Sequence, residues 1–419
     1  MKILTINCGS SSVKYSLWDM GVRERVCEGI AERVTFDGSF IKHKVKGKTE
    51  EVVKKDSPKH DTAIAMILSL LTDRKLGVID DVSEIDAVGH RVVHGGRHFT
   101  RSVKIDESVI RVIEQCSRLA PLHNPPNLLG IKIAMEAMPN IPHFAVFDTA
   151  FLSTLPPHTY IYGIPYEWYE KFDVRKYGFH GTSHLYVSRR AAALLGRKPS
   201  EVNVITVHIG NGVSITAVKK GAAYDHSMGF TPLEGAVMGT RCGDIDPAIP
   251  LVMMRQLNVN ADDMEEILNT KSGLLGITGK YVDRRDIRKA AKEGDERSRL
   301  AIDVECYRLR KYIGAYVAAM NGTDCIVFTA GVGENSPLYR EKICENLNSL
   351  GIAIDKEKNE QAVGAGEREI GSSESRVKIF VIPTNEELVF AEDAVALLQN
   401  RYDIHTQFEY EFQKIGYRP

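Results

Sequence analysis

The sequence predicts an α/β fold made of two similar lobes, and three observations support this. Strand-like and helix-like segments alternate along most of the chain, which is typical of α/β layers. A chain of 419 residues is too long for one compact core, so two domains are expected. A pattern of strand, polar glycine turn and strand occurs at 2–18 and again at 203–218, which indicates an internally duplicated architecture.

The first part of the chain begins with strands and continues with helices. Strands are expected at 2–7, 12–18, 25–34, 39–46, 86–96 and 143–151, and helices at 60–72, 106–119 and 125–137. Asn124 precedes two prolines, a common start of a helix, because a proline in the first turn has no amide that needs a partner. Lysines gather at 42–55, which we interpret as a solvated edge strand and loop.

The second part alternates in the same way. Besides the hairpin at 203–218, strands are expected at 325–330 and 378–384, and helices at 246–257, 262–269, 294–320, 337–349 and 386–399. Ser336 and Pro337 suit the cap and the first position of one of these helices. Because the chain has no low-complexity linker, structured crossovers are expected to join the lobes.

Composition excludes several classes of protein. The net charge of −1 gives no general basic field for nucleic acid or for an anionic membrane surface. No apolar run approaches 18 residues, so no membrane span is expected, and the apolar start MKILTINC is too short for a secretion signal. Seven scattered cysteines without a C-x-x-C motif indicate reduced thiols and a cytoplasmic protein.

Polar or glycine-rich turns directly follow several strands. They lie at 7–12, 94–96, 210–212 and 331–335, and in α/β sheets ligands bind at the carboxyl ends of strands. Amides at a glycine turn can point at phosphate oxygens, because the chain without a Cβ can approach closely. The usual P-loop motif is absent. Each turn by itself could serve only as a tight connection, but together they indicate a nucleotide site.

Charged and imidazole side chains lie on strands, at the ends of strands or in the motifs YGFHGTSH and MGTRCGDIDP. They are Arg91, Asp148, His180, His208, Arg241 and Glu386. Phosphoryl transfer needs such groups, since there the protein mainly positions the reactants and neutralises charge. Each of them alone could be a surface ion pair or an ordinary histidine. The pattern becomes a site only if the fold brings these residues together.

Two pairs of histidines have four-residue spacing, His180 with His184 and His94 with His98. The segment between the first pair, Gly-Thr-Ser, is a poor helix interior, and the Glu of the H-E-x-x-H motif is missing. Without a helix the spacing has no geometric meaning for a metal. We therefore do not expect a zinc site.

Ordered motifs from residue 1 to about 400 together resemble the acetate kinase (acetokinase) family. They are INCGSSSVKYSL, GHRVVHGG, LAPLHNPPNL, FDTAF, RKYGFHGTSH, VHIGNGVSI, DHSMGFTPLEGAVMGTRCGDIDP, FTAGVGENS and VIPTNEEL. The resemblance implies reversible transfer of a phosphoryl group between ATP and acetate, giving ADP and acetyl phosphate, with Mg²⁺ (Mn²⁺ as an alternative). It also implies the duplicated, ribonuclease H-like fold of the actin, Hsp70 and sugar-kinase superfamily, with a central nucleotide cleft.

The resemblance also implies roles for residues on the nucleotide side. Asn7 and Glu386 are similar to the residues that hold Mg²⁺, which prefers oxygen ligands and retains water. Phosphate contacts are expected from two groups: Ser10, Ser12 and Lys14 in the first hairpin, and His208, Ile209, Gly210, Asn211 and Gly212 in the second. The adenosine pocket is expected from Asp283, Arg284, Arg285, Gly331, Val332, Gly333, Glu334 and Asn335.

On the acyl side, Arg91 and Arg241 resemble the pair that holds the carboxylate and the phosphoryl group, and His180 resembles a hydrogen-bond donor to that phosphoryl group. The apolar pocket around the acetate methyl is expected from Val93, Leu122, Phe179 and Pro232. Asp148 is commonly assigned an acid/base role in this family. Acetate is already ionised at neutral pH, however, so we expect Asp148 to orient Arg91, Arg241 or a water on Mg²⁺.

We expect one lobe from residues 1–148 and 385–419, and the other from 149–384. The resemblance implies a homodimer. The segment after about residue 400 extends beyond the usual family length, and it is expected to pack on the N-terminal lobe or to bind a partner. A propionate or other short-chain acid kinase is the alternative enzyme, and a nucleotide-gated binding protein is the alternative from another class.

Overall fold

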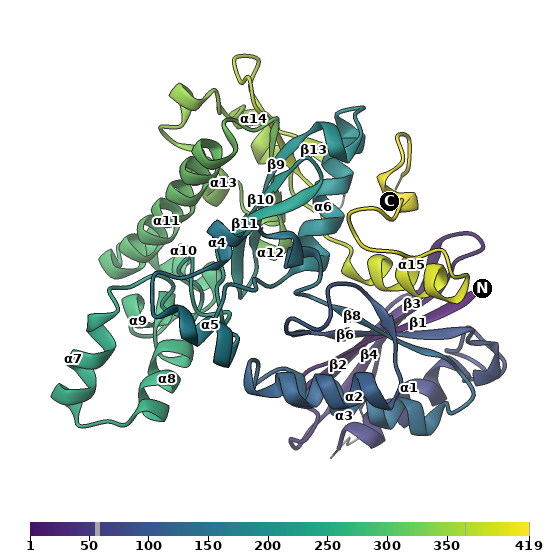
Figure 1. Cartoon of the computed structure of the whole chain (residues 1–419). Helices are drawn as coiled ribbons and strands as arrows, with labels where there is room; N and C mark the ends of the chain where they lie inside the picture. Colours follow the sequence, from purple (N-terminus) through teal and green to yellow (C-terminus); the bar gives the residue numbers. More distant parts are fainter. Residues whose placement is uncertain (55–58, 365, 419) are drawn as a thin grey trace. The chain divides into compact units, whose positions relative to one another are not determined.

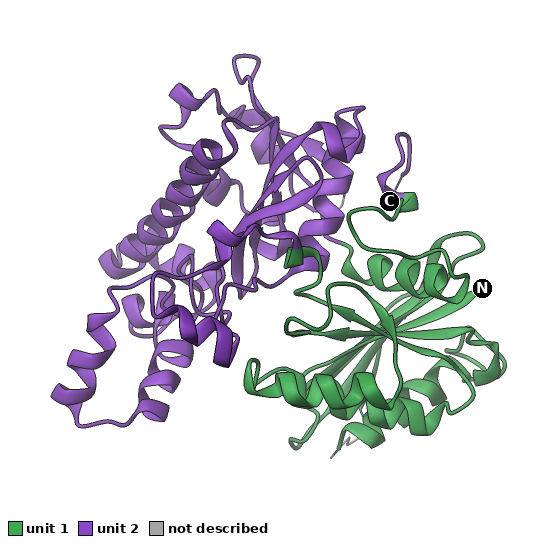
Figure 2. Cartoon of the chain, viewed as in Figure 1, with its two compact units in different colours: residues 1–153, 385–411 green, residues 154–384, 412–419 purple. Residues whose placement is uncertain are grey.

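The computed structural model describes residues 1–54, 59–364 and 366–418, drawn in Figure 1. Residues 55 and 419, at the ends of two predicted segments, lie outside this part. The chain forms two compact units, which Figure 2 colours separately. Unit 1 comprises Met1–Ser153 and Asn385–Glu411, and unit 2 comprises Thr154–Thr384 and Phe412–Pro419. The end of the chain therefore differs from the expected division, because residues from Phe412 onward belong to unit 2.

Unit 1 is built on an eight-stranded sheet with the order β5-β4-β3-β2-β1-β6-β8-β7. Strands β1, β6 and β8 are parallel neighbours, and the remaining pairs are antiparallel. The strands are β1 (Lys2–Cys8), β2 (Ser12–Asp19), β3 (Glu24–Glu32), β4 (Phe40–Val45), β5 (Glu51–Lys54), β6 (Ala87–Val92), β7 (Val103–Lys104) and β8 (His143–Phe147).

Helices cover both faces of this sheet, as Figure 1 shows. They are α1 (His60–Leu71), α2 (Glu107–Gln115), α3 (Asn124–Ala137) and α15 (Glu386–Leu398). Alternation along β1 directs Leu4, Ile6 and Cys8 into a buried cluster with residues of α1 and α3. Residues on the other face of the central strands pack against α15, where Gly89 of β6 lies under Phe390. Because helices cover both faces of the sheet, β1 is buried along most of its length.

Unit 2 has a six-stranded sheet with the order β11-β10-β9-β12-β14-β13. Its strands are β9 (Asn203–Ile209), β10 (Val213–Lys219), β11 (Ala222–His226), β12 (Cys325–Thr329), β13 (Arg368–Glu369) and β14 (Lys378–Val381). Its helices are α4 (Pro157–Tyr160), α5 (Tyr166–Phe172), α6 (Gly181–Leu194), α7 (Ala248–Leu257), α8 (Ala261–Thr270), α9 (Gly273–Thr278), α10 (Arg284–Lys292), α11 (Glu296–Met320), α12 (Ala330–Asn335), α13 (Pro337–Cys344) and α14 (Lys356–Gln361).

The two sheets share one five-stranded core. In unit 1 it is β3-β2-β1-β6-β8, and in unit 2 it is β11-β10-β9-β12-β14. In both cores an antiparallel three-stranded meander is followed by two strands parallel to its first strand. This repeated order confirms the predicted two-lobed α/β fold with a duplicated, ribonuclease H-like core.

Several local predictions were wrong. The expected turn at 331–335 is the short helix α12, and the segment after His180 is helix α6. Gly181, Thr182 and Ser183 occupy the first turn of α6, and burial along most of the helix outweighs their weak helix propensity. The described residues contain no group of three or more His, Cys, Asp or Glu side chains that could hold a metal ion.

The C-terminal segment after α15 contains no strand in its described part and is anchored in two places. In unit 1, the Tyr410 hydroxyl donates to the Asp393 carboxylate at 2.8 Å. In unit 2, the buried Arg190 guanidinium donates to the Phe412 carbonyl at 2.6 Å. Packing on the N-terminal lobe therefore applies only to the part of the segment before Phe412.

The cysteines form no disulfide in the described chain. Burial raises the pKa of the Cys8 thiol to about 12, so Cys8, next to the first polar turn, is an inert packing residue. In the described part of the chain, no helix is both long and apolar enough to cross a membrane.

The contact between α3 and β1 yields a stability prediction. A Cβ added at Gly130 would lie 2.5 Å from the Cβ of Cys8. We expect Gly130→Ala to destabilise the fold by about 1–3 kcal/mol through overpacking, and thermal unfolding followed by circular dichroism measures this. Gly314→Ala in α11 is the control, since a Cβ there meets no atom within 4 Å. Equal melting temperatures for the two variants would contradict the close packing of α3 on β1.

Candidate active site

Three predicted residues lie at one edge of the unit 1 sheet. Asn7 follows Ile6, which is paired with His90, so Asn7 lies beside Arg91 on the neighbouring parallel strand. Asp148 comes directly after β8, whose Val146 is paired with Arg91. The carboxyl ends of β1, β6 and β8 therefore bring these three side chains to one edge, as expected for an α/β ligand site.

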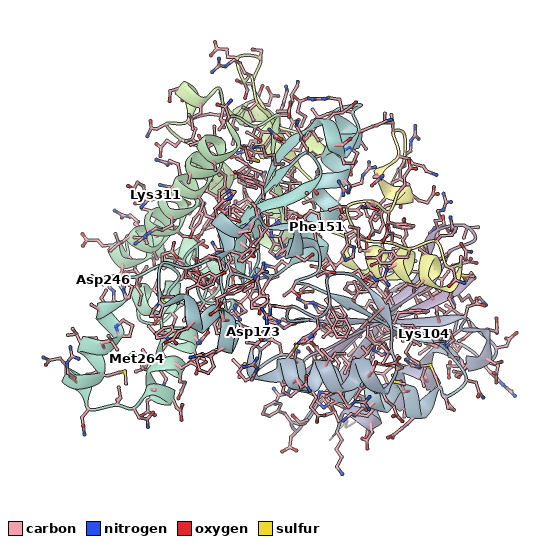
Figure 3. All side chains as sticks on the ribbon, viewed as in Figure 1. Lys104, Phe151, Asp173, Asp246, Met264 and Lys311 are labelled. Atoms are coloured by element: carbon pink, nitrogen blue, oxygen red, sulfur yellow. The ribbon has the colours of Figure 1, made fainter. Side chains whose placement is uncertain are left out.

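Arg91 and Asp148 form a bidentate ion pair. The Arg91 Nε donates to Asp148 Oδ1 at 3.0 Å, and Nη2 donates to Oδ2 at 2.6 Å. Asp148 is 1% exposed and precedes the buried turn that contains Phe151, labelled in Figure 3. Burial alone would lower the pKa of Arg91, but the charges of Asp148 and Glu386 and the hydrogen bonds to Asp148 outweigh it, so the pKa is raised. Arg91 is therefore a fixed cation held in one orientation.

The oxygen groups of Asn7 and Glu386 suit a hard cation. Glu386 is the first residue of α15, which packs on the same face of the sheet as Asn7 and Gly89. This helix approaches closely at Gly89, because a Cβ there would lie 3.2 Å from the Phe390 carbonyl oxygen. Both side chains are partly exposed, and an amide with a carboxylate is a plausible protein ligand set for Mg²⁺ that retains water.

The turn between β1 and β2 is a tight hairpin closed by a hydrogen bond from the Gly9 amide to the Ser12 carbonyl at 2.8 Å. Ser10 and Lys14 are exposed and Ser12 is partly exposed. Lys14 is paired with Asn7 across the hairpin. The predicted phosphate groups of this hairpin are thus accessible from solvent, and their contact with phosphate stays a prediction.

Asn127 ties this hairpin to the neighbouring strand, a role that the sequence analysis missed. Its Nδ2 donates to the Cys8 carbonyl at 2.6 Å, and its Oδ1 accepts from the Val93 amide at 3.0 Å. Asn124, one turn earlier on α3, bonds instead to the amide and the carbonyl of His94. The NPPN motif could have signalled this, since both asparagines lie in the first turn of a buried helix.

In unit 2, His180 lies at the N-cap of α6 with φ of +58°, an uncommon conformation for a residue with a side chain. Its Nδ1 lies 2.8 Å from the Ser214 hydroxyl, and its ring stacks on His208 with 4.3 Å between the centroids. The preceding amide, of Phe179, donates to Nε2 of the buried His226 at 3.1 Å. The imidazole of His180 is thus held from several sides.

Arg241 and His180 both lie next to Gly212, in the turn between β9 and β10. A Cβ at Gly212 would lie 3.4 Å from Nε2 of His180 and 3.7 Å from Nη1 of Arg241. Burial lowers the pKa of Arg241, and Arg241 forms no ion pair within the described residues. An arginine that is partly desolvated without a carboxylate partner is prepared to bind an anion.

The predicted nucleotide residues of unit 2 gather around a cavity of about 700 Å³. Its lining is Gly210, Asn211, Val282, Asp283, Arg284, Arg285, Arg288, Gly331, Val332, Asn335 and Ser336. Val282, Arg288 and Ser336 were not predicted to line a nucleotide site. Arg288 reaches this cavity only because residues 284–292 fold into a helix. Of the residues predicted for nucleotide binding in unit 2, His208, Ile209, Gly212, Gly333 and Glu334 are not in the described lining.

Some of these residues also support the backbone. Arg284 pairs with the buried Glu305 at 3.0 Å through Nε and donates to the Gly210 carbonyl at 2.8 Å, so its guanidinium positions the turn. Asp283 caps α10 by accepting from the Arg285 amide at 2.7 Å. Hydrogen bonds from the Arg285 side chain and amide lower the pKa of Asp283 to about 2. Burial raises the pKa of Glu334.

The predicted acyl residues are divided between the units. Val93 in unit 1 and Phe179 in unit 2 are buried, whereas Leu122 is 64% exposed and Pro232 is partly exposed. Neither unit by itself contains the complete apolar pocket. Its assembly around a methyl group stays a prediction.

Substitution of Asn127 tests whether the hairpin at the edge of the unit 1 sheet binds phosphate. In Asn127→Asp the carboxylate cannot donate to the Cys8 carbonyl, and one lost buried hydrogen bond costs about 1–3 kcal/mol. If the hairpin binds phosphate, the Kd for ATP should rise about tenfold, as measured by calorimetry. Asn124→Asp is the matched control, because its contacts lie away from the hairpin. Equal weakening in both variants would contradict a specific role for Asn127.

Comparisons with known proteins agree with this geometry. The model of the acetokinase family matches residues 2–392. An acetate kinase of Geobacter sulfurreducens is 54% identical, covering 100% of this chain and 99% of that protein, and one of Thermotoga maritima is 54% identical, covering 95% and 99%.

Solved structures agree as well. An acetate kinase of Porphyromonas gingivalis has a TM-score of 0.89 and 47% identity, covering 95% of this chain and 99% of that chain. A propionate kinase of Francisella tularensis has a TM-score of 0.88 and 40% identity, covering 94% and 99%. The chain therefore belongs to the acetokinase family.

Proposed function

We propose that the chain is an acetate kinase, which reversibly transfers the γ-phosphoryl group of ATP to acetate and forms ADP and acetyl phosphate. The observation that carries this proposal is the β9–β10 turn. Its Gly210 and Asn211 line the 700 Å³ cavity, while its Gly212 lies against His180 and Arg241. One turn thus connects a nucleotide-sized cavity with the cationic groups that phosphoryl transfer needs.

The chemistry explains the composition of the site. Acetate is a carboxylate that must approach the polyanionic end of ATP, so charge repulsion is the main barrier that the protein can reduce. Arg241 and His180 would bind the transferred phosphoryl group, and Arg91 would hold the carboxylate. In-line attack then needs no base, because the nucleophile is already ionised. Arg91 belongs to unit 1, and His180 and Arg241 belong to unit 2.

Mg²⁺, or Mn²⁺ in its place, would be held by Asn7 and Glu386 together with the phosphates. When bound, the metal neutralises phosphate charge. The side chain of Glu386 also contributes to the raised pKa of Arg91, which supports its closeness to the proposed carboxylate site.

We propose that Asp148 orients Arg91 and does not transfer a proton. Two hydrogen bonds from Arg91 occupy both of its carboxylate oxygens. These hydrogen bonds fix the guanidinium of Arg91 in one orientation, and the reaction needs no proton acceptor, because acetate is already ionised.

The alternatives are less well supported. The propionate kinase of F. tularensis has nearly the same TM-score as the P. gingivalis acetate kinase, so the fold does not separate the two activities. The 54% identity to acetate kinases favours acetate. A nucleotide-gated binding protein would have no use for the Arg91–Asp148 pair or the partly buried Arg241.

We also propose a homodimer that works in the cytoplasm with acetate and ATP as its small-molecule partners, without nucleic acid or membrane. Exposed apolar side chains on α5 and α7 support association with a second copy. They are Tyr166, Trp168, Phe172, Ile249, Leu251, Val252 and Leu257. The free thiols fit a reducing compartment.

The experiment that tests the function is a coupled assay for acyl phosphate formation from ATP with acetate, propionate and butyrate, and for ATP formation in reverse. Acetate should give the highest kcat/KM. A higher kcat/KM for propionate would favour the alternative enzyme. Nucleotide binding without acyl phosphate from any of these acids would favour the binding protein.

Val93 should set the preference between acids. One methylene is worth roughly 1–3 kcal/mol of discrimination, so Val93→Ala should raise kcat/KM for propionate relative to acetate by roughly tenfold. The control is Val92→Ala, the same truncation one residue earlier, where the buried side chain points to the opposite face of β6. Selectivity that shifts equally in both variants would show that Val93 does not contact the acyl group.

The proposed role of Asp148 predicts that the kinetic effects of substituting Asp148 and Arg91 are not additive. Asp148→Asn should lower kcat/KM for acetate by about 10²-fold, the loss expected when an electrostatic donor is misoriented. Combined with Arg91→Ala, it should cause little further loss, because both residues act through one guanidinium. Steady-state kinetics of the two single variants and the double variant measure this. An additive loss, or a new pH dependence in Asp148→Asn, would favour the acid/base role.

A further inference from the structure

A chain of buried polar groups runs from His180 into the core of unit 2. The His180 Nδ1 lies 2.8 Å from the Ser214 hydroxyl, which lies 2.7 Å from Nε2 of His184. The Nδ1 of His184 lies 2.7 Å from the Thr206 hydroxyl, and that hydroxyl lies 3.4 Å from the Thr216 carbonyl oxygen. Ser214, His184 and Thr206 are fully buried.

The protons in this chain can be counted. Burial keeps the pKa of His184 well below its usual value, and the nearby His226 and His208 lower it further. His184 is therefore neutral, with one ring nitrogen that donates and one that accepts. Each hydroxyl has a single proton to donate. Two directions of donation then give every hydroxyl proton an acceptor within the chain.

The Thr216 carbonyl, at the end of this hydrogen-bonded chain, selects the direction of donation. The Thr216 carbonyl can only accept, so Thr206 donates to it and accepts from Nδ1 of His184. Nε2 of His184 then accepts from Ser214, whose oxygen in turn accepts from Nδ1 of His180. In the opposite direction the Thr206 hydroxyl donates its one proton to Nδ1 of His184, so it makes no hydrogen bond to the Thr216 carbonyl. The first direction makes one more hydrogen bond in a fully buried region, where unmade bonds are costly.

This direction has a consequence at His180. Its Nδ1 always carries a proton, so the neutral ring has a lone pair on Nε2. Nε2 and Cε1 of this ring lie beside Gly212, where an added Cβ would lie 3.4 Å from Nε2 and 3.7 Å from Nη1 of Arg241. A lone pair there would repel a phosphoryl oxygen. His180 can donate from Nε2 only when the ring carries a second proton.

We propose that Ser214, His184 and Thr206 are positioning residues that hold the proton of His180 on Nδ1, so that His180 acts on the transferred phosphoryl group as an imidazolium. This rests on the function proposed above and adds the charge state of the histidine. Within unit 2, the titratable groups facing His180 are the stacked His208, His184 beyond Ser214, and Arg241. Arg241 opposes the second proton, whereas the phosphoryl anion favours it.

The first experiment observes the proton directly. Histidines carrying ¹⁵N in both ring nitrogens are followed by NMR through a pH titration of the substrate-free protein. The His180 signals are assigned by their loss in His180→Asn. We expect neutral His180 to carry its proton on Nδ1. A neutral His180 with its proton on Nε2 would overturn the proposal, whether or not the protein shows kinase activity.

The second experiment changes the hydrogen-bonded chain at Thr206, at the end away from His180. Thr206→Val keeps the side-chain shape but removes the hydroxyl that selects the direction, so the neutral ring should carry its proton on Nε2. Thr206→Ser is the matched control, and it should keep the proton on Nδ1. If Thr206→Val fails to fold, Ser214→Ala, which breaks the chain beside His180, should give the same change. An unchanged Nδ1 proton in the folded variant would overturn the proposal.

Kinetics complete the test. The wild-type kcat should fall about tenfold per pH unit above the ionisation of His180, and Thr206→Ser should keep this slope. The slope should be shallower in Thr206→Val, because a neutral ring could then donate from Nε2. Equal slopes in the two variants would contradict the imidazolium role. A wild-type protein without activity would instead refute the proposed function, and the NMR result would still decide the direction of the chain.

Discussion

Each unit is organised by one constraint, an antiparallel hairpin whose first strand has a parallel neighbour on its other side. Because β1 runs parallel to β6, and β9 runs parallel to β12, each hairpin turn lies at the edge where the parallel strands also end. Turn amides, strand-end side chains and helix N-termini are therefore collected along one edge. Under the proposed function, phosphate would be bound at this edge without a P-loop, since no helix has to follow the first strand.

Arg91 and Arg241 lie in different electrostatic environments. Arg91 is oriented and neutralised by Asp148, whereas Arg241 is partly buried and its pKa is lowered by that burial. A paired guanidinium retains its geometry, while one that is desolvated without a partner gains most from binding an anion. In the proposed function, Arg91 would hold the substrate carboxylate and Arg241 the phosphoryl group. These two proposed roles differ because the environments of the two arginines differ.

Supporting residues were harder to predict than the residues that face the ligand. Arg91, Asp148 and the GNG turn stood out because polar residues that follow apolar strands are unusual. Asn127 and Ser214 did not stand out, since an asparagine in a first helical turn and a serine in a strand have many ordinary explanations. Helix α12 was taken for a loop because its glycines suggest a turn. Tertiary packing and Arg340, which donates to the Gly333 carbonyl at 2.8 Å, outweigh that local preference.

The sequence by itself determined the α/β class, the duplication, the family and the residues at the strand ends, because hydrophobic periodicity and ordered motifs are local properties. The tertiary structure decided which of these residues touch. It paired Arg91 with Asp148, placed Arg284 against Glu305, and joined His180 to Thr206 through Ser214 and His184. Such contacts join residues far apart in the chain and depend on strand register and helix packing, which no local pattern encodes.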